Sequence, residues 1–140
     1  MNNTLPQFIK NLDGKQLSDE TVISAQMFDD ENSVICITVE DREEFPIYMT
    51  VDEGQILCTV HLFGEDQVNP SKRAAMIEDM LMLNISIPLS AFSKVGNQYV
   101  MFGALSPNSS IEDLLHEIEL LSDNVLEAID AISDYLKEAA

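Results

Sequence analysis

Two histidines are the first residues of this chain that could take part in acid–base or nucleophilic chemistry. His61 lies in an apolar, strand-like run, and His116 lies in an acidic helical stretch. Catalysis of that kind needs an activated serine or cysteine beside the histidine, and the chain has neither a G-x-S-x-G nor a Cys–His signature. Glycine-rich phosphate-binding loops are also absent. The sequence therefore predicts no catalytic residues, and we expect a protein that is not an enzyme.

Acidic clusters are a second source of chemistry, because carboxylate groups bind calcium and magnesium. One cluster contains Asp29, Asp30 and Glu31, and another contains Asp52 and Glu53. If both clusters lie in turns of a β-meander, the two turns fall at the same end of the sheet. No EF-hand spacing accompanies them, and acidic turns are common because they are solvated. We therefore expect no metal ion and no other cofactor, and a small-ligand or divalent-metal-binding domain is the alternative interpretation.

Length, composition and net charge limit the classes of protein to which this chain can belong. The chain has 140 residues, of which 46% are hydrophobic, so it is long enough for one folded domain spanning residues 1–140. Its net charge of −18 argues against binding to nucleic acid or to an anionic membrane surface. There is no apolar run of roughly 20 residues, and residues 1–6 do not resemble a signal peptide. We expect a cytoplasmic protein that is not inserted into a membrane.

The N-terminal half has the pattern of a short helix followed by a β-meander. Thr4 and Gln7 have the spacing of a capping box, which predicts a helix over 5–12. Four apolar runs follow, at 21–28, 34–40, 46–51 and 55–63, and the short turns between them favour antiparallel pairing. The last run is apolar on both faces, which indicates a central strand. It contains Cys58, and the second run contains Cys36; their spacing matches no zinc or redox motif, so we expect free thiols.

The C-terminal half has the pattern of helix, hairpin and helix. Asn69 followed by Pro70 predicts the start of a helix over 70–83, and the runs 85–92 and 98–105 predict a hairpin. Ser109 and Glu112 have capping-box spacing, which predicts a last helix over 110–137 with one buried apolar stripe. The expected fold class is α+β: an antiparallel meander plus a C-terminal hairpin, packed against a short N-terminal helix, a middle helix and a long C-terminal helix.

Charge distribution indicates a region for binding a partner. Residues 1–63 carry a net charge of −9 and residues 109–140 carry −8, whereas residues 64–108 carry −1. The nearly neutral segment contains Met76, Met80 and Met82, and flexible methionine side chains suit adaptable binding surfaces. A methionine stripe at helical spacing is more often part of a core. We expect Met80 to lie in the core, and Met76 or Met82 to lie nearer a contact surface.

The last helix has an acidic face that is a second candidate for partner binding. Glu119 and Asp123 are the residues we select on it. A solvated face is the ordinary interpretation of such a charge pattern.

Two resemblances add to these inferences. The order of elements, the small size and the acidity are similar to the type III secretion chaperone-like fold. The segments 87–92, 99–106, 110–113 and 117–125 resemble the YjfI family of small bacterial proteins, whose genes tend to lie near one for a phage-shock-protein-A-like coiled-coil protein. The resemblance implies a protein partner in an envelope-stress setting and supplies no catalytic residues.

The sequence thus predicts a non-enzymatic, acidic protein-interaction module, chaperone-like or linked to bacterial envelope stress. Its expected partner is another protein, with a second copy of the chain, forming a homodimer, as one option.

Overall fold

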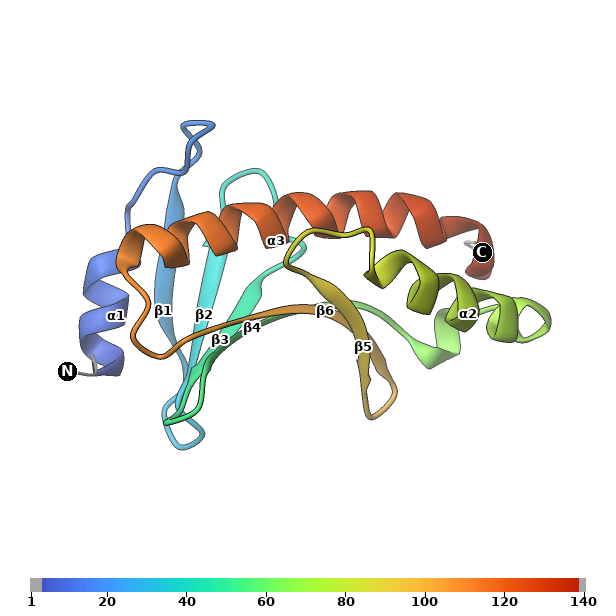
Figure 1. Cartoon of the computed structure of the whole chain (residues 1–140), viewed down its shortest axis with the longest axis horizontal. Coiled ribbons are helices and arrows are strands. Elements are labelled where there is room, and N and C mark those ends of the chain that lie inside the picture. The colour runs from blue at the N-terminus through green and yellow to red at the C-terminus, as the bar shows by residue number, and fades with distance from the viewer. Residues whose placement is uncertain (1–3, 139–140) are drawn as a thin grey trace.

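A six-stranded antiparallel sheet forms the frame of the protein (Figure 1), and the computed structural model describes residues 4–138. The strand order is β1-β2-β3-β4-β6-β5, so β4 is central, as predicted, and β1 and β5 are the edges. The pairs β1–β2, β2–β3, β3–β4, β4–β6 and β6–β5 are all antiparallel. The bounds are β1 Ile23–Asp29, β2 Val34–Val39, β3 Ile47–Val51, β4 Ile56–Gly64, β5 Ala91–Val95 and β6 Gln98–Leu105.

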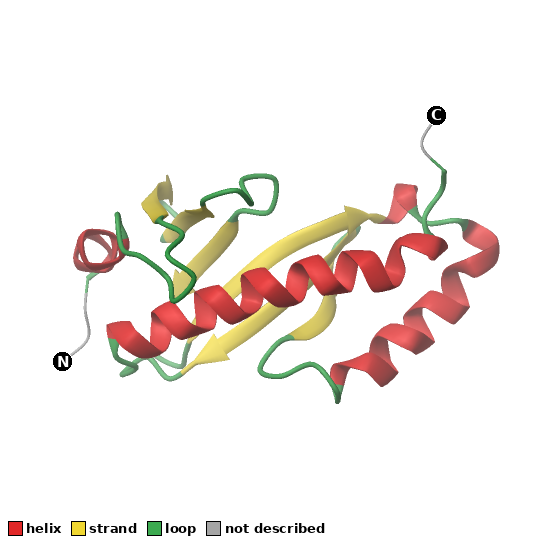
Figure 2. Cartoon of the chain, turned by 90° about the horizontal axis from the view of Figure 1, so that it is seen from above, coloured by secondary structure: helices red, strands yellow, loops and turns green. Residues whose placement is uncertain are grey.

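Three α-helices complete the expected α+β fold: α1 Leu5–Leu12, α2 Arg73–Asn84 and α3 Ile111–Ile132. The long α3 runs across one face of the sheet, α1 lies at the β1 end, and α2 lies at the β5 end (Figures 1 and 2). Short 3-10 turns occur at Glu65–Gln67, Pro70–Lys72 and Ser133–Tyr135. Among residues 4–138, no helix has the length and apolar character needed to cross a membrane.

The core lies between α3 and the face of the sheet that it covers. Strand alternation places Ile56, Cys58 and Val60 of β4 on that face, where they are buried, and α3 contributes Ile118 and Val125. Residues directly opposite each other on neighbouring strands lie on the same face of the sheet, so Met101 of β6, which pairs with Val60, lies on this face too. Cys36 is half-buried and lies on the opposite face, because Cys36 pairs with Tyr48 whereas Cys58 pairs with Met49. Both thiols are free, as predicted.

Local sequence signals explain the start of the chain. The Thr4 hydroxyl accepts a hydrogen bond from the Gln7 backbone N–H, and the Gln7 side chain accepts one from the Thr4 N–H. This capping box confirms the prediction for α1, whose observed bounds match the expected helix over 5–12.

The prediction of a strand over 85–92 is wrong in its first part, because β5 begins only at Ala91. Pro88 has no backbone N–H, and Leu89 has a φ of +63°, which is incompatible with an extended strand. The Asn124 side chain donates hydrogen bonds to the Pro88 carbonyl oxygen and to Ser90 Oγ, each over 3.0 Å. Segment 85–90 is therefore a loop tied to α3. Both of these partners of Asn124 lie just before β5, which begins at Ala91.

The last two helices differ slightly from their predicted bounds. Ser110, not Ser109, caps α3, because Ser110 Oγ accepts from the Asp113 N–H while the Ser109 N–H closes a turn onto the Ser106 carbonyl. The helix ends at Ile132 and gives way to a 3-10 turn, short of the predicted residue 137. Before α2, Asn69 caps a 3-10 turn, and the α-helix starts at Arg73.

Candidate functional site

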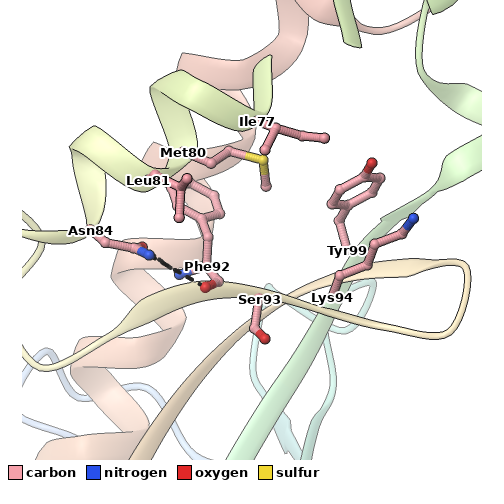
Figure 3. A pocket seen from close by; sticks show the side chains of 8 residues that line it. All are labelled: Ile77, Met80, Leu81, Asn84, Phe92, Ser93, Lys94 and Tyr99. Carbon is pink, nitrogen blue, oxygen red and sulfur yellow. Dashed lines mark hydrogen bonds between the residues drawn. The ribbon is translucent and has the colours of Figure 1, made fainter. Parts of the chain in front are cut away.

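An apolar groove lies between α2 and the edge strand β5 (Figure 3). Its volume is about 270 Å³. Ile77 and Met80 project from α2, and Phe92 and Tyr99 project from the hairpin below them (Figure 3). The remaining lining residues are Leu81, Asn84, Ser93 and Lys94.

At one end of the groove, the Asn84 side chain hydrogen-bonds to the backbone of β5 as a neighbouring strand would. Asn84 Oδ1 accepts from the Phe92 N–H over 2.6 Å, and Asn84 Nδ2 donates to the Phe92 carbonyl oxygen over 3.4 Å (Figure 3). The Phe92 backbone groups therefore face away from β6. In an antiparallel ladder the outward-facing residues alternate, so the N–H and C=O of Lys94 also point outward. Neither has a hydrogen-bond partner within residues 4–138.

The other end of the groove carries a compact charge cluster around Glu65. Its Oε1 accepts from Lys94 Nζ and from Arg73 Nε, each over 2.8 Å, and from the Tyr99 hydroxyl over 3.0 Å. Hydrogen bonds from Lys94, and then from Arg73 and Tyr99, lower the pKa of Glu65 to about 2. Burial, followed by the hydrogen bond to Glu65, raises the pKa of Tyr99. The cluster holds two cations and one anion, a positive excess on a protein of net charge −18.

Exposed apolar side chains gather beside this groove. Leu81, Met82 and Ile85 have neighbouring positions on the surface of α2 and its C-terminus, because residues three and four apart share a helix face. Ile85 is 92% exposed, and Leu89 in the following loop is 66% exposed. We call Leu81, Met82, Ile85 and Leu89 the 81–89 patch. Single exposed apolar residues are ordinary, whereas four within nine consecutive residues make this segment a candidate contact surface.

The three methionines selected from the sequence divide between core and surface. Met76 and Met80 are buried against the sheet, at 0% and 5% exposure, and Met80 also lines the groove. Met82 is 58% exposed and belongs to the 81–89 patch. Of these side chains, the described chain leaves Met82 free to contact a partner directly.

Glu119 and Asp123, the selected residues of the acidic face, both hold α3 to other parts of the chain. Glu119 accepts hydrogen bonds from the Ser18 N–H and hydroxyl. Asp123 forms an ion pair with Arg42, which also donates to Ser122 Oγ. They fasten the loop before β1 and the loop before β3 to α3, on a different part of the molecule from the α2–β5 groove.

The two histidines both lie on the surface of the protein. His61 is exposed on β4, with its ring edge-on to Tyr48 at a centroid distance of 5.8 Å, and it lines a shallow hollow with Phe28 and Tyr48. His116 is exposed on α3. Within residues 4–138 neither imidazole is hydrogen-bonded to a hydroxyl, thiol or carboxylate group.

The Asp29 and Asp52 carboxylates of the acidic turns accept hydrogen bonds from residues of their own turns. Asp29 accepts from the Asn32 N–H and side chain, and Asp52 accepts from the N–H groups of Gly54 and Gln55. In the described part of the chain, no group of three or more His, Cys, Asp or Glu side chains is placed to hold a metal ion.

Sequence reasoning missed one buried acid. Glu117 is 2% exposed, and its Oε1 has no hydrogen-bond partner among residues 4–138. Burial raises its pKa to about 7. Its position in the helix could have predicted this burial, because Glu117 is three residues after Leu114 and four before Leu121 and so lies on the apolar stripe.

The fold and the groove define an α+β protein with one antiparallel sheet, helices on one face, and an apolar edge surface. The chain belongs to the family described as uncharacterized protein conserved in bacteria (DUF2170), whose match covers residues 2–136. The crystal structure of YbjN from E. coli, described as "a putative transcription regulator", is similar, with a TM-score of 0.64 and 15% sequence identity over 98% of this chain and 97% of that chain. At this identity the likeness shows the fold alone. None of the curated proteins matches the sequence.

These findings agree with the expected resemblance at the level of an uncharacterized bacterial family. The YjfI name and the chaperone-like architecture stay predictions.

Proposed function

We propose that this protein is a non-enzymatic interaction module that binds a protein partner through the α2–β5 groove and the 81–89 patch. The observation that carries the proposal is the location of that patch. Four exposed large apolar side chains occur together on the segment of the chain that is almost neutral, beside an apolar groove. Removing this surface from water favours association, at about 25 cal/mol per Å² of apolar area.

The edge of β5 supplies polar backbone groups that a partner can bind by hydrogen bonds. The outward N–H and C=O of Lys94 have no partner within residues 4–138, and a peptide backbone complements such a pair. Asn84 already makes the equivalent contacts at Phe92, which shows that this edge accepts an amide group. A polypeptide partner satisfies both the apolar patch and this pair.

The likeness to YbjN supports a regulatory setting for the interaction. YbjN is described as "a putative transcription regulator", and regulators act through contacts with other macromolecules. For this chain, the net charge of −18 favours a protein partner over nucleic acid. A cytoplasmic location, a chaperone-like role and a link to bacterial envelope stress belong to the same proposal. A small-ligand or metal-binding role at the acidic turns has less support, because Asp29 and Asp52 are engaged by their own turns.

A cross-linking experiment with matched variants tests the proposal. A photo-reactive residue at position 85 should capture a partner in bacterial cells, and the purified pair should then be measured by calorimetry. The variants Leu81→Asp and Ile85→Asp should keep the melting temperature and weaken binding at least tenfold. Phe28→Asp, at an exposed apolar residue of β1 on the opposite edge, is the control and should bind normally.

Two results would count against the proposal. One is unchanged binding by both Leu81→Asp and Ile85→Asp, and the other is an equal loss of binding in the Phe28→Asp control. Sedimentation velocity of the purified protein shows whether the partner is a second copy of the chain, because Ile85→Asp would then convert a dimer into a monomer.

A further inference from the structure

Glu117 lies in the core without a partner for one of its oxygens. Its side chain projects from α3 toward β6 and is 2% exposed, and Oε1 makes no hydrogen bond within residues 4–138. Burying a carboxylate without a partner is much more costly than burying a neutral carboxyl group. The ionisation state of Glu117 therefore affects the free energy of keeping this side chain covered by neighbouring residues.

Gly103 on β6 makes room for this carboxyl group. A Cβ atom at position 103 would overlap Glu117 Oε1, and it would lie 3.1 Å from the carbonyl oxygen of Leu89. The carboxyl group of Glu117 and the Leu89 carbonyl thus flank the same small space beside the β6 backbone. The backbone of the 85–90 loop at Leu89 is thus part of the cover over Glu117.

That cover is held in a strained conformation by a few contacts. Leu89 has a φ of +63°, which costs free energy in a residue other than glycine and persists only when surrounding contacts impose it. Asn124 supplies two of these contacts, to the Pro88 carbonyl and to Ser90 Oγ. Asn124 lies two helical turns after Glu117, so the same face of α3 presents both residues to the loop.

We propose that Glu117 is a proton-operated latch on the 85–90 loop, closed when its carboxyl group is neutral and released when that group is ionised. A neutral carboxyl group can stay beneath residues 88–90. An ionised one must reach water, and displacing residues 88–90, of which Leu89 is strained, disturbs the fold less than moving β6 or α3. Burial raises the pKa of Glu117 to about 7, which places the transition near neutral pH.

The groups that face Glu117 leave it without a charged partner. From β4, Cys58 is the titratable neighbour; burial, and then Glu117, raise its pKa to about 12, so it stays a neutral thiol. From β6 the neighbour is Gly103, and Pro88, Leu89 and Ser90 of the loop do not titrate. On α3, Asp113 and His116 are exposed to solvent.

A consequence concerns binding. Ile85 and Leu89 of the 81–89 patch lie on the latched loop, so release of the latch changes the shape of that surface. This consequence rests on the proposed function, whereas the latch itself is tested without any partner.

Hydrogen exchange of the purified protein at pH 6 and pH 8 tests the latch. The reporters are the amides of Ser86 and Ile87, bonded to the Leu83 carbonyl, and of Phe92, bonded to Asn84. Between these pH values, opening of the wild-type loop should become about tenfold more favourable after correction for intrinsic exchange, because one pKa unit is a tenfold change. Glu117→Gln should abolish the change, and Glu112→Gln, at an exposed acid of the same helix, should keep it.

Three outcomes would overturn the latch. The reporters could keep equal protection at both pH values, or Glu117→Gln could show the wild-type response. The reporters could also exchange with the same opening free energy as amides of β2 such as Ile35, distant from the loop, which would indicate that they exchange only through global unfolding. Any of these results leaves the cross-linking test of the proposed function unaffected.

Discussion

The carboxyl group of Glu117 occupies the space that the Cβ atom of any larger residue at position 103 would need. A glycine inside a strand ordinarily weakens that strand, because it increases the flexibility of the unfolded chain and buries no side chain. At position 103 the absence of a side chain instead lets an acid of α3 lie against the backbone of β6. The two positions therefore act as a pair.

Gly103→Ala should destabilise the protein by about 1–3 kcal/mol, because the added methyl group forces Glu117 out of its buried position. In a Glu117→Ala background most of this loss should disappear. A double-mutant cycle from urea denaturation measures the coupling between the two positions. Equal effects of Gly103→Ala in both backgrounds would show that the two residues do not act as a pair.

The pH dependence of stability should carry the signature of Glu117. Its pKa rises from an ordinary 4.5 to about 7 on folding, so between these values the folded state binds more protons than the unfolded state. The free energy of unfolding should therefore fall as the pH rises through this window, by about 3 kcal/mol from this residue, and level off above pH 7. Urea midpoints of the wild type and of Glu117→Gln should diverge accordingly, with a flatter profile for the variant.

Glu65 should act in the opposite direction and in a more acidic range. Lys94, and then Arg73 and Tyr99, hold its pKa at about 2, so its stabilising contribution is present above pH 4.5 and is lost as the pH falls toward 2. Glu65→Gln should therefore show a smaller loss of stability on acidification between pH 4.5 and 2. Circular dichroism during acid titration, with Asp66→Asn as the exposed neighbouring control, measures the difference.

Met76 and Met82 should respond very differently to the same substitution. Met76→Lys buries a charge without a partner in the core and should cost more than about 4 kcal/mol, enough to unfold a domain of ordinary stability. Met82→Lys changes an exposed side chain and should alter stability by less than about 0.5 kcal/mol. Circular dichroism melting curves of the two variants check this, and a folded Met76→Lys protein would contradict the placement of that side chain.

Features that depend on residues close together along the chain could be predicted from local patterns. The Thr4–Gln7 capping box involves residues three apart, and it predicts α1 with the observed bounds. Alternation within each run sets which side chains of β4 face the helices, and the short turns allow only antiparallel neighbours, so the meander follows from local patterns. The apolar stripe of α3 is likewise a local periodicity.

Other features depend on contacts between residues that are distant along the chain, and these could not be predicted. Segment 85–90 has a strand-like composition, yet Asn124, more than thirty residues later, binds it as a loop. The exposed and buried methionines of α2 separate only because α2 packs with Met76 and Met80 toward the sheet. Glu117 has the sequence context of one more acid on an acidic helix, and its burial arises because α3 crosses β6 at a glycine. Such a crossing fixes the environment of a side chain, and no local pattern of residues encodes it.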